Sequence, residues 1–199
     1  GKSTLINLLA GKILRPVHDA DLNRVDVVAD DELPAFRIGR GVESETRIPR
    51  RCVIDGVSYW DCPGLNDNRG VAQEIANAVL IKKVFDVSKS VKILFVVDRS
   101  EIGDIRAPAL IEHIEALDLL LLGDVERVKD SISLVATKVF NNDTIKNVKA
   151  NLERVVPLLE GSRKKLVEYL INQKISLFRR PENAADQIDS KNIKESVLN

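Results

Sequence analysis

The chain carries no net charge, no methionine and no apolar run near the roughly 20 residues that a membrane-spanning helix requires. Its 30 basic and 30 acidic residues cancel, so no overall field attracts nucleic acid, and we expect neither a nucleic-acid partner nor a transmembrane segment. Cys52 and Cys62 lack the paired spacing of a zinc site, which favours free thiols and a cytoplasmic protein. The absence of methionine, even at position 1, indicates a chain excised from a longer protein.

Alternating helical and strand patterns predict one α/β domain over residues 1–199, with a mostly parallel sheet. A polar, aperiodic stretch over 16–34 indicates a long loop, and Asp55-Gly56 predicts a hairpin turn between two antiparallel strands. Gly123 is placed to end one helix and Ser162 to cap another. The expected helices cover 4–10, 71–87, 107–122, 143–156, 163–172 and the start of one in 189–199, and the expected strands cover 47–54, 56–61, 91–97, 131–136 and 175–178.

The first four residues, Gly1, Lys2, Ser3 and Thr4, match the second half of the phosphate-binding P-loop, GxxxxGK[S/T]. In that loop, backbone N–H groups surround the phosphates, the lysine reaches the outer phosphates, and the hydroxyl binds Mg²⁺. The apolar pattern that follows predicts a helix, whose N-terminus would favour an anion. We therefore expect all four residues to bind nucleotide, and Ser3 to be a metal ligand as well.

A second motif, the sequence from Asp61 to Gly64, fits the DxxG pattern and follows an apolar run that predicts a buried strand. The carboxylate of Asp61 would hold Mg²⁺ through water, and the Gly64 N–H would face the γ-phosphate because no Cβ blocks its approach. Both motifs end in loops at the carboxyl edge of the expected sheet, where ligands of open α/β sheets bind. Together they predict a nucleotide site.

With these two motifs the chain resembles P-loop GTPases, and within them the septin-like and immunity-associated branch. The resemblance implies a three-layer P-loop fold with an antiparallel edge hairpin, and a GTPase domain truncated at both ends, whose first strand precedes Gly1 and is missing. It implies Mg²⁺ as cofactor, GTP and GDP as ligands, and a homodimer that forms across the nucleotide face. Catalytic roles then fall to Lys2, Thr46 and Gly64.

The sequence from Gly41 to Thr46 resembles the first switch of that branch. Thr46 would be an Mg²⁺ ligand beside Ser3, because Mg²⁺ takes few protein ligands in a rigid octahedral shell. Ser44 is the alternative ligand, and Thr46 would then only begin a strand.

The base-recognition motif of these GTPases, N/TKxD, is matched in part by Thr137 and Lys138, but Phe140 stands in the place of the aspartate. An aromatic ring cannot accept the two hydrogen bonds of guanine, so Asp143 is the candidate substitute if the loop is bulged. Otherwise base selectivity is weak, since a lost polar contact of this kind costs orders of magnitude in discrimination. Thr137, Lys138 and Asp143 complete the expected nucleotide-binding residues.

Leu65 follows the DxxG motif where Ras-like proteins have a glutamine that orients the attacking water. We therefore expect slow hydrolysis, with a partner or another loop supplying the missing group, and Arg69 is a candidate by its position alone. The favoured interpretation is a Mg²⁺-dependent GTPase that acts as a switch or assembles. The alternatives are a pseudo-GTPase that serves as an interaction module, and a P-loop ATPase with altered base recognition.

Overall fold

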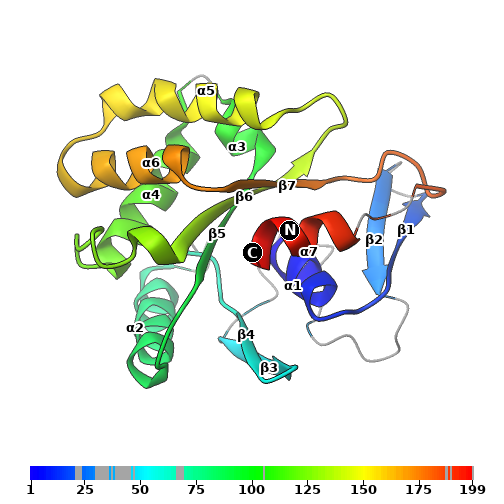
Figure 1. Cartoon of the computed structure of the whole chain (residues 1–199), viewed down its shortest axis with the longest axis horizontal. Helices are drawn as coiled ribbons and strands as arrows, with labels where there is room; N and C mark the ends of the chain where they lie inside the picture. Colours follow the sequence, from blue (N-terminus) through cyan, green and yellow to red (C-terminus); the bar gives the residue numbers. More distant parts are fainter. Residues whose placement is uncertain are drawn as a thin grey trace.

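The computed structural model describes the chain except for residues 21–23, 30–35, 37, 39–45, 47, 66–69, 105, 187, 189 and 199. It is an α/β structure built on a parallel sheet of three strands in the order β5-β6-β7 (Figure 1). The strands are β1 Leu14–Asp19, β2 Arg24–Ala29, β3 Arg50–Ile54, β4 Val57–Asp61, β5 Ile93–Asp98, β6 Ile132–Val139 and β7 Ile175–Arg179. The α-helices are α1 Lys2–Leu9, α2 Val71–Val87, α3 Arg99–Gly103, α4 Pro108–Leu120, α5 Ile145–Val155, α6 Gly161–Asn172 and α7 Ser190–Leu198.

Helices cover both faces of the parallel sheet (Figure 1). Leu134 and Ala136 of β6 belong to a core shared with α3, α4, α5 and α6, whereas Val135 belongs to a second core shared with α1 and α7. Successive side chains of a strand point to opposite faces, so this alternation places the two cores on opposite sides of β6. A strand buried on both faces is expected to be apolar throughout, as residues 132–136 are apart from Ser133.

Most expected elements are confirmed. The helix at 71–87, the parallel strands and the helix before Gly123 are present, and Gly123 has φ 71°, which suits the end of a helix. Asp55 and Gly56 have φ values of 49° and 78° and join β3 to β4, as a two-residue hairpin turn requires.

Three expectations are wrong. The stretch at 16–34, expected as a loop, includes most of the antiparallel hairpin β1–β2, in which Pro16 lies opposite Val27. Hairpin β3–β4 was expected at the edge of the parallel sheet, but among the described residues it forms a two-stranded sheet of its own. Ser162 does not cap a helix: α6 begins one residue earlier, and the Ser162 hydroxyl donates to Asp118 Oδ2 at 2.9 Å.

Asn7 fixes α1 to the segment that leads toward Thr46. Its side chain is fully buried, and its Nδ2 donates to the carbonyls of Ser3 (2.8 Å) and Phe36 (2.6 Å). Its Oδ1 accepts the Phe36 N–H at 3.0 Å. Phe36 is itself only 1 % exposed. Because buried amide groups need partners, this one side chain satisfies backbone groups of two segments that are far apart in the sequence.

We predict that Asn7→Ala lowers the free energy of unfolding by about 1–3 kcal/mol, since it leaves buried backbone groups of Phe36 unpaired. Urea denaturation measures this change. The control is Asn172→Ala, which removes an exposed bond to the Glu168 carbonyl and should change stability by less than about 0.5 kcal/mol. Equal effects of the two substitutions would contradict the anchoring role of Asn7.

Candidate functional site

Asp61 is the centre of the candidate site. It is the last residue of β4 and is 3 % exposed, a degree of burial that a carboxylate tolerates only with good partners. Its Oδ2 accepts hydrogen bonds from Ser3 Oγ at 2.8 Å and from Thr46 Oγ1 at 3.1 Å. The structure therefore brings together the three residues that the sequence predicts as metal ligands.

Each of these three side chains comes from a different segment. Ser3 lies in the first turn of α1, Asp61 ends the hairpin β3–β4, and Thr46, which is 8 % exposed, precedes that hairpin. Ser44, the alternative ligand, and Arg69 lie outside the described residues. Two hydroxyls and one carboxylate converging on one point are oxygen donors of the kind that Mg²⁺ prefers.

The donor set fits Mg²⁺ that shares its shell with a phosphate. Within the described parts of the chain, no group of three or more His, Cys, Asp or Glu side chains is placed to hold a metal ion. Mg²⁺ rarely occupies an all-carboxylate cage; it is usually held by one or two protein groups together with phosphate oxygens and water. A cation among Ser3, Thr46 and Asp61 would take the place of the two hydrogen bonds between their side chains.

The N-terminus of α1 has features that favour an anion. No side chain caps this end, and the first turn contains no acidic residue. The first intrahelical bond runs from the Leu5 N–H to the Gly1 carbonyl, so the N–H groups of Lys2, Ser3 and Thr4 have no partner within the helix. The Thr4 side chain is buried, so only the backbone N–H of this residue could contact an anion. Free N–H groups and the helix dipole both favour negative charge here.

Lys2 and Gly64 meet at this end of α1. A Cβ atom added to Gly64 would lie 3.8 Å from Lys2 Nζ, so the expected phosphate lysine and the glycine of the DxxG motif are neighbours. A Cβ on Gly1 would lie 3.1 Å from Thr137 Oγ1, which places the end of β6 beside the start of the chain. The two phosphate motifs and the first residue of the base motif therefore lie around one helix terminus.

Two residues beside Asp61 have no catalytic chemistry of their own. Burial, with a further contribution from the Asp61 charge, raises the pKa of the Cys62 thiol to about 11, so the nucleophilic thiolate is scarce at neutral pH. Leu65 packs against the main hydrophobic core, which anchors the end of the DxxG loop. This packing gives Leu65 a structural role.

Side chains at the end of β6 are tied to the end of β5. Lys138, at φ 55°, pairs with Asp98 at 2.6 Å, and the Thr137 hydroxyl donates to the Val97 carbonyl at 3.2 Å. Burial alone would raise the pKa of Asp98, but the Lys138 ammonium and the hydrogen bonds from Ser100 outweigh it and hold the pKa below its usual value. Strand register shifts between Thr137 and Val139, so a bulge is present at Lys138.

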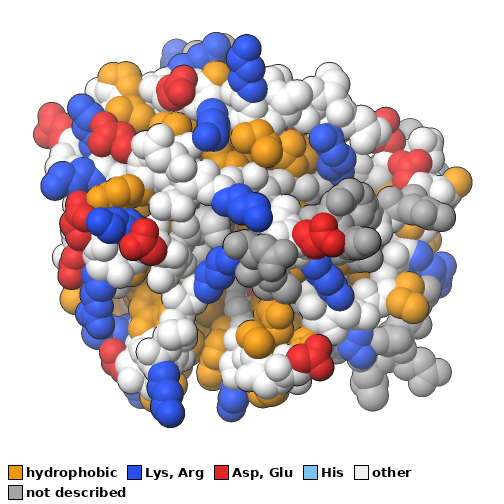
Figure 2. All heavy atoms as spheres, in the orientation of Figure 1, with side chains coloured by type: hydrophobic (Ala, Val, Ile, Leu, Met, Phe, Trp, Pro, Cys, Tyr) orange, Lys and Arg blue, Asp and Glu red, His pale blue; other side chains and the backbone are white. Residues whose placement is uncertain are grey.

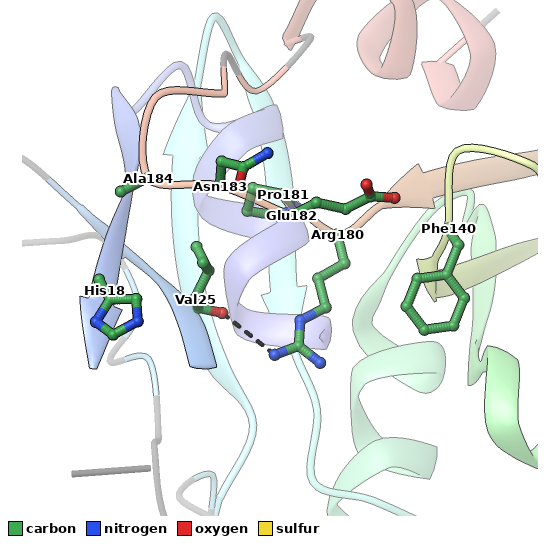
Figure 3. A pocket seen from close by; sticks show the side chains of 8 residues that line it. All are labelled: His18, Val25, Phe140, Arg180, Pro181, Glu182, Asn183 and Ala184. Atoms are coloured by element: carbon green, nitrogen blue, oxygen red, sulfur yellow. Dashed lines mark hydrogen bonds between the residues drawn. The ribbon is translucent and has the colours of Figure 1, made fainter. Parts of the chain in front are cut away.

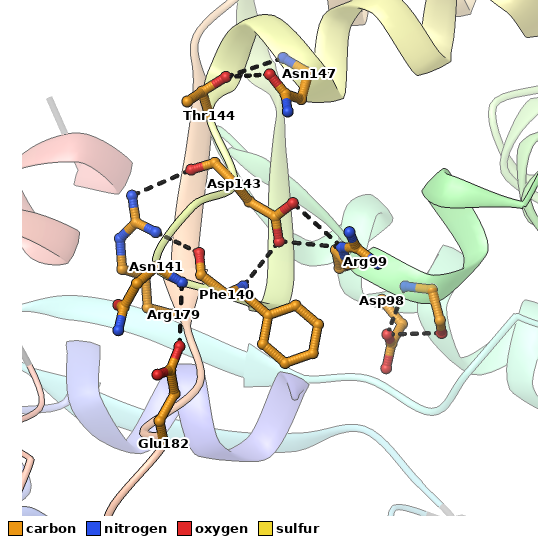
Figure 4. A network of polar contacts seen from close by, with 10 residues as sticks. Asp98, Arg99, Phe140, Asn141, Asp143, Thr144, Asn147, Arg179 and Glu182 are labelled. Atoms are coloured by element: carbon orange, nitrogen blue, oxygen red, sulfur yellow. Dashed lines mark hydrogen bonds and ion pairs between the residues drawn. The ribbon is translucent and has the colours of Figure 1, made fainter.

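Asp143 closes the loop that follows β6 (Figure 4). Its Oδ2 accepts the Phe140 N–H at 2.8 Å and pairs with Arg99 Nε at 3.0 Å, and its carbonyl accepts from Arg179 at 3.3 Å. Burial would raise its pKa, but the Phe140 N–H, Arg99 and Arg179 lower it below the usual value. Arg99 also lies over the Phe140 ring, 5.3 Å from the centroid. The carboxylate proposed as the substitute base acceptor is thus engaged in holding its own loop.

A cavity of about 470 Å³ lies next to this loop and was not anticipated from the sequence (Figure 3). It is lined by residues from β1, β2, the loop after β6 and the segment after β7: His18, Val25, Phe140, Arg180, Pro181, Glu182, Asn183 and Ala184. The one feature of the sequence that pointed to an unusual site here is Phe140, which stands in the place of an aspartate. The remaining lining residues come together through tertiary packing, which no local motif records.

Basic and acidic side chains are interspersed over the face shown in Figure 2, in keeping with the balanced composition. A single-sign patch, as nucleic-acid binding requires, is not visible on that face. Among the residues that the structure describes, no helix combines the length and the apolar character needed to cross a membrane.

Comparisons with protein-family models, with curated proteins and with solved structures found no match to this chain.

We predict that Asp143→Asn lowers the free energy of unfolding by about 1–3 kcal/mol at pH 6, because it removes a charged acceptor from Arg99 and Phe140. A depressed pKa means that the ionised form stabilises the native state above the ordinary value of about 4, and that this stabilisation is lost as pH falls below it. The difference between wild type and variant should therefore shrink toward pH 2.5.

Thermal unfolding followed by circular dichroism at several pH values measures this difference. Asp130→Asn, at an exposed aspartate, is the control and should change little. A difference between wild type and Asp143→Asn that stays constant from pH 7 to pH 2.5 would show that the charge on Asp143 does not stabilise the loop.

Proposed function

We propose that this protein is a P-loop GTPase of the septin-like and immunity-associated kind, which binds GTP with Mg²⁺, hydrolyses it slowly and acts as a switch or an assembling GTPase. The convergence of Ser3 and Thr46 on the buried carboxylate of Asp61 carries the proposal. These residues belong to three separate sequence motifs, and a purely structural role would not require all three at the uncapped end of a helix.

The residues of the chain divide the phosphate-binding work. Lys2 supplies the positive charge for the outer phosphates, and the N–H groups of the first turn of α1 surround them. Gly64, the neighbour of Lys2, offers its N–H to the γ-phosphate. Ser3, Thr46 and Asp61 hold Mg²⁺, directly or through water. When bound, Mg²⁺ offsets the charge of the phosphates.

Hydrolysis is slow because Leu65 stands where a glutamine would orient the attacking water. The Leu65 side chain packs against the core and has no polar atom, so it cannot orient the water that attacks the γ-phosphate. A homodimer across the nucleotide face would let a second copy supply the missing group and shield the site from bulk water. Free thiols and GTP as ligand are consistent with a cytoplasmic location.

The alternative function is a pseudo-GTPase that keeps the fold as an interaction module. Two observations favour it: the packing of Leu65 against the core, and the ion pair that engages Lys138 with Asp98. A P-loop ATPase is the third candidate, because Phe140 replaces the aspartate that reads guanine.

We predict that Lys2→Ala lowers the affinity for GTP at least about tenfold, since charge-assisted hydrogen bonds to phosphate are lost. Ser3→Ala and Thr46→Ala should lower it only when Mg²⁺ is present, because these hydroxyls act through the metal. Isothermal titration of the purified protein with GTP, with Mg²⁺ and with EDTA, measures both effects.

Lys146→Ala, at an exposed lysine of α5, is the matched control and should leave GTP affinity unchanged. If Lys2→Ala binds GTP as tightly as Lys146→Ala, the phosphate site is not at the N-terminus of α1. If Ser44→Ala abolishes the Mg²⁺ effect while Thr46→Ala preserves it, the switch ligand is Ser44.

We predict turnover on the order of 10⁻⁴ to 10⁻² s⁻¹ at high dilution, as for switch GTPases without a partner, rising per molecule as concentration increases. Phosphate release across a concentration series measures this, with light scattering reporting the oligomeric state. Leu65→Gln should not accelerate turnover, and it should lower stability because a polar side chain replaces a packed one. Turnover independent of concentration would rule out the dimer mechanism, and bound GTP with no turnover at any concentration would favour the pseudo-GTPase.

A further inference from the structure

Hydrogen bonds fix the backbone of the segment after β7 that lines the cavity beside Phe140. On the side that follows β7, the Arg180 N–H donates to the Val139 carbonyl at 3.0 Å, which joins this segment to the end of β6. Further along, Asp186 Oδ2 accepts the N–H groups of Glu182 at 2.7 Å and Asn183 at 2.9 Å. These hydrogen bonds fix the backbone of the wall that carries Arg180 and Glu182.

The opposite wall presents an aromatic surface. Phe140 is 42 % exposed although it is a large apolar residue, and Arg99 lies over its ring. Arg179 donates to the Phe140 carbonyl and Asp143 accepts its N–H, so the backbone of this residue is fixed from two sides. An exposed ring on a fixed backbone is a surface on which a nucleobase can stack.

The cavity lies within reach of a nucleotide bound at α1. Thr137, which neighbours Gly1, is separated from Phe140 by three positions, and at about 3.3 Å per residue this is a span of at most about 10 Å. The bulge at Lys138 shortens it further. A ligand with phosphates at the N-terminus of α1 could therefore place its base in the cavity.

The polar groups of the cavity complement guanine. Glu182 accepts one long hydrogen bond, from the Asn141 N–H to Oε1 at 3.5 Å, and within the described part of the chain its Oε2 accepts none (Figure 4). Arg180 donates one bond, to the Val25 carbonyl at 3.5 Å, and keeps further N–H donors (Figure 3). A carboxylate suits the N1–H and 2-amino donors of guanine, and a guanidinium suits its O6 acceptor. Adenine has a lone pair and an amino group where guanine has N1–H and O6.

We propose that this cavity binds the guanine base of the nucleotide and that Glu182 reads its N1–H and 2-amino groups, in place of the aspartate that Phe140 replaces. The proposal rests on the nucleotide-binding function proposed above. Phe140 stacks on the base, and Asp143 positions Phe140 without touching the ligand. Glu182 is thus a specificity-determining residue that lies after β7, about 40 positions along the chain from the base motif.

The test is the exchange of one atom at Glu182. In Glu182→Gln the side-chain NH₂ faces the 2-amino group of guanine but can donate to the 2-oxo group of xanthine. We expect wild type to bind GTP at least about tenfold more tightly than XTP or ATP, and Glu182→Gln to reverse the order of GTP and XTP. ITP, which lacks the 2-amino group, should bind wild type more weakly than GTP. The substitution Glu182→Gln should lower the affinity for ITP no more than it lowers the affinity for GTP. Titration calorimetry with Mg²⁺ measures all four affinities.

The control Glu153→Gln changes an exposed glutamate on α5 and should keep the wild-type order of affinities. Phe140→Leu should weaken GTP and XTP by a similar factor, because stacking does not distinguish the two bases. An unchanged order of GTP over XTP in Glu182→Gln overturns the role of Glu182 and leaves the phosphate site standing. Equal binding of GTP by wild type and Lys2→Ala would instead overturn the proposed function, and absence of binding by all four nucleotides would overturn both.

Discussion

The burial of one carboxylate constrains the part of the molecule where α1 begins and β4 ends. Asp61 is 3 % exposed, and an ionised group in such a place needs partners that arrive with defined geometry. Those partners, Ser3 and Thr46, come from α1, which also lies against β4, and from the segment that precedes the hairpin β3–β4. Satisfying Asp61 therefore fixes the relative positions of three segments, and the same requirement makes the junction suitable for a cation when phosphate is present.

A second polar network performs the equivalent task around the end of the sheet. Arg99 follows β5 directly and reaches across to the loop after β6, where it contacts Asp143 and Phe140. The neighbouring pair of Asp98 and Lys138 ties the same two strand ends. Backbone bonds add to these contacts, since the Asp143 N–H donates to the Phe140 carbonyl at 3.1 Å and the Arg180 N–H to the Val139 carbonyl at 3.0 Å. The two ion pairs hold the loop that carries the exposed ring of Phe140.

The sequence predicted the features that depend on local pattern. The apolar run at 93–97 predicted β5, because a strand buried on both faces is apolar along its length. The helix at 71–87 is present, although its apolar residues do not gather on one buried face: Ile75 is 60 % exposed and Val79 is 50 % exposed. The hairpin β1–β2 was missed because Pro16 and the surrounding acidic residues favour a loop, whereas an edge strand tolerates proline. Ser3, Thr46 and Asp61 could be selected because each belongs to a motif. Glu182 and Arg180 could not, since no motif places the segment after β7 beside the loop after β6.

The sharing of one hydrophobic core by α1 and α7 has a consequence for the order in which the chain acquires structure. Leu5 and Leu8 of α1 pack with Ile193 and Val197 of α7, and the Ser176 hydroxyl of β7 donates to the Ser196 carbonyl at 3.0 Å. During synthesis the residues of α1 emerge from the ribosome long before those of α7. The apolar face of α1 is therefore fully covered only after nearly the whole described chain has been made, and the end of α1 that carries Lys2 and Ser3 is among the last parts of the described chain to become rigid.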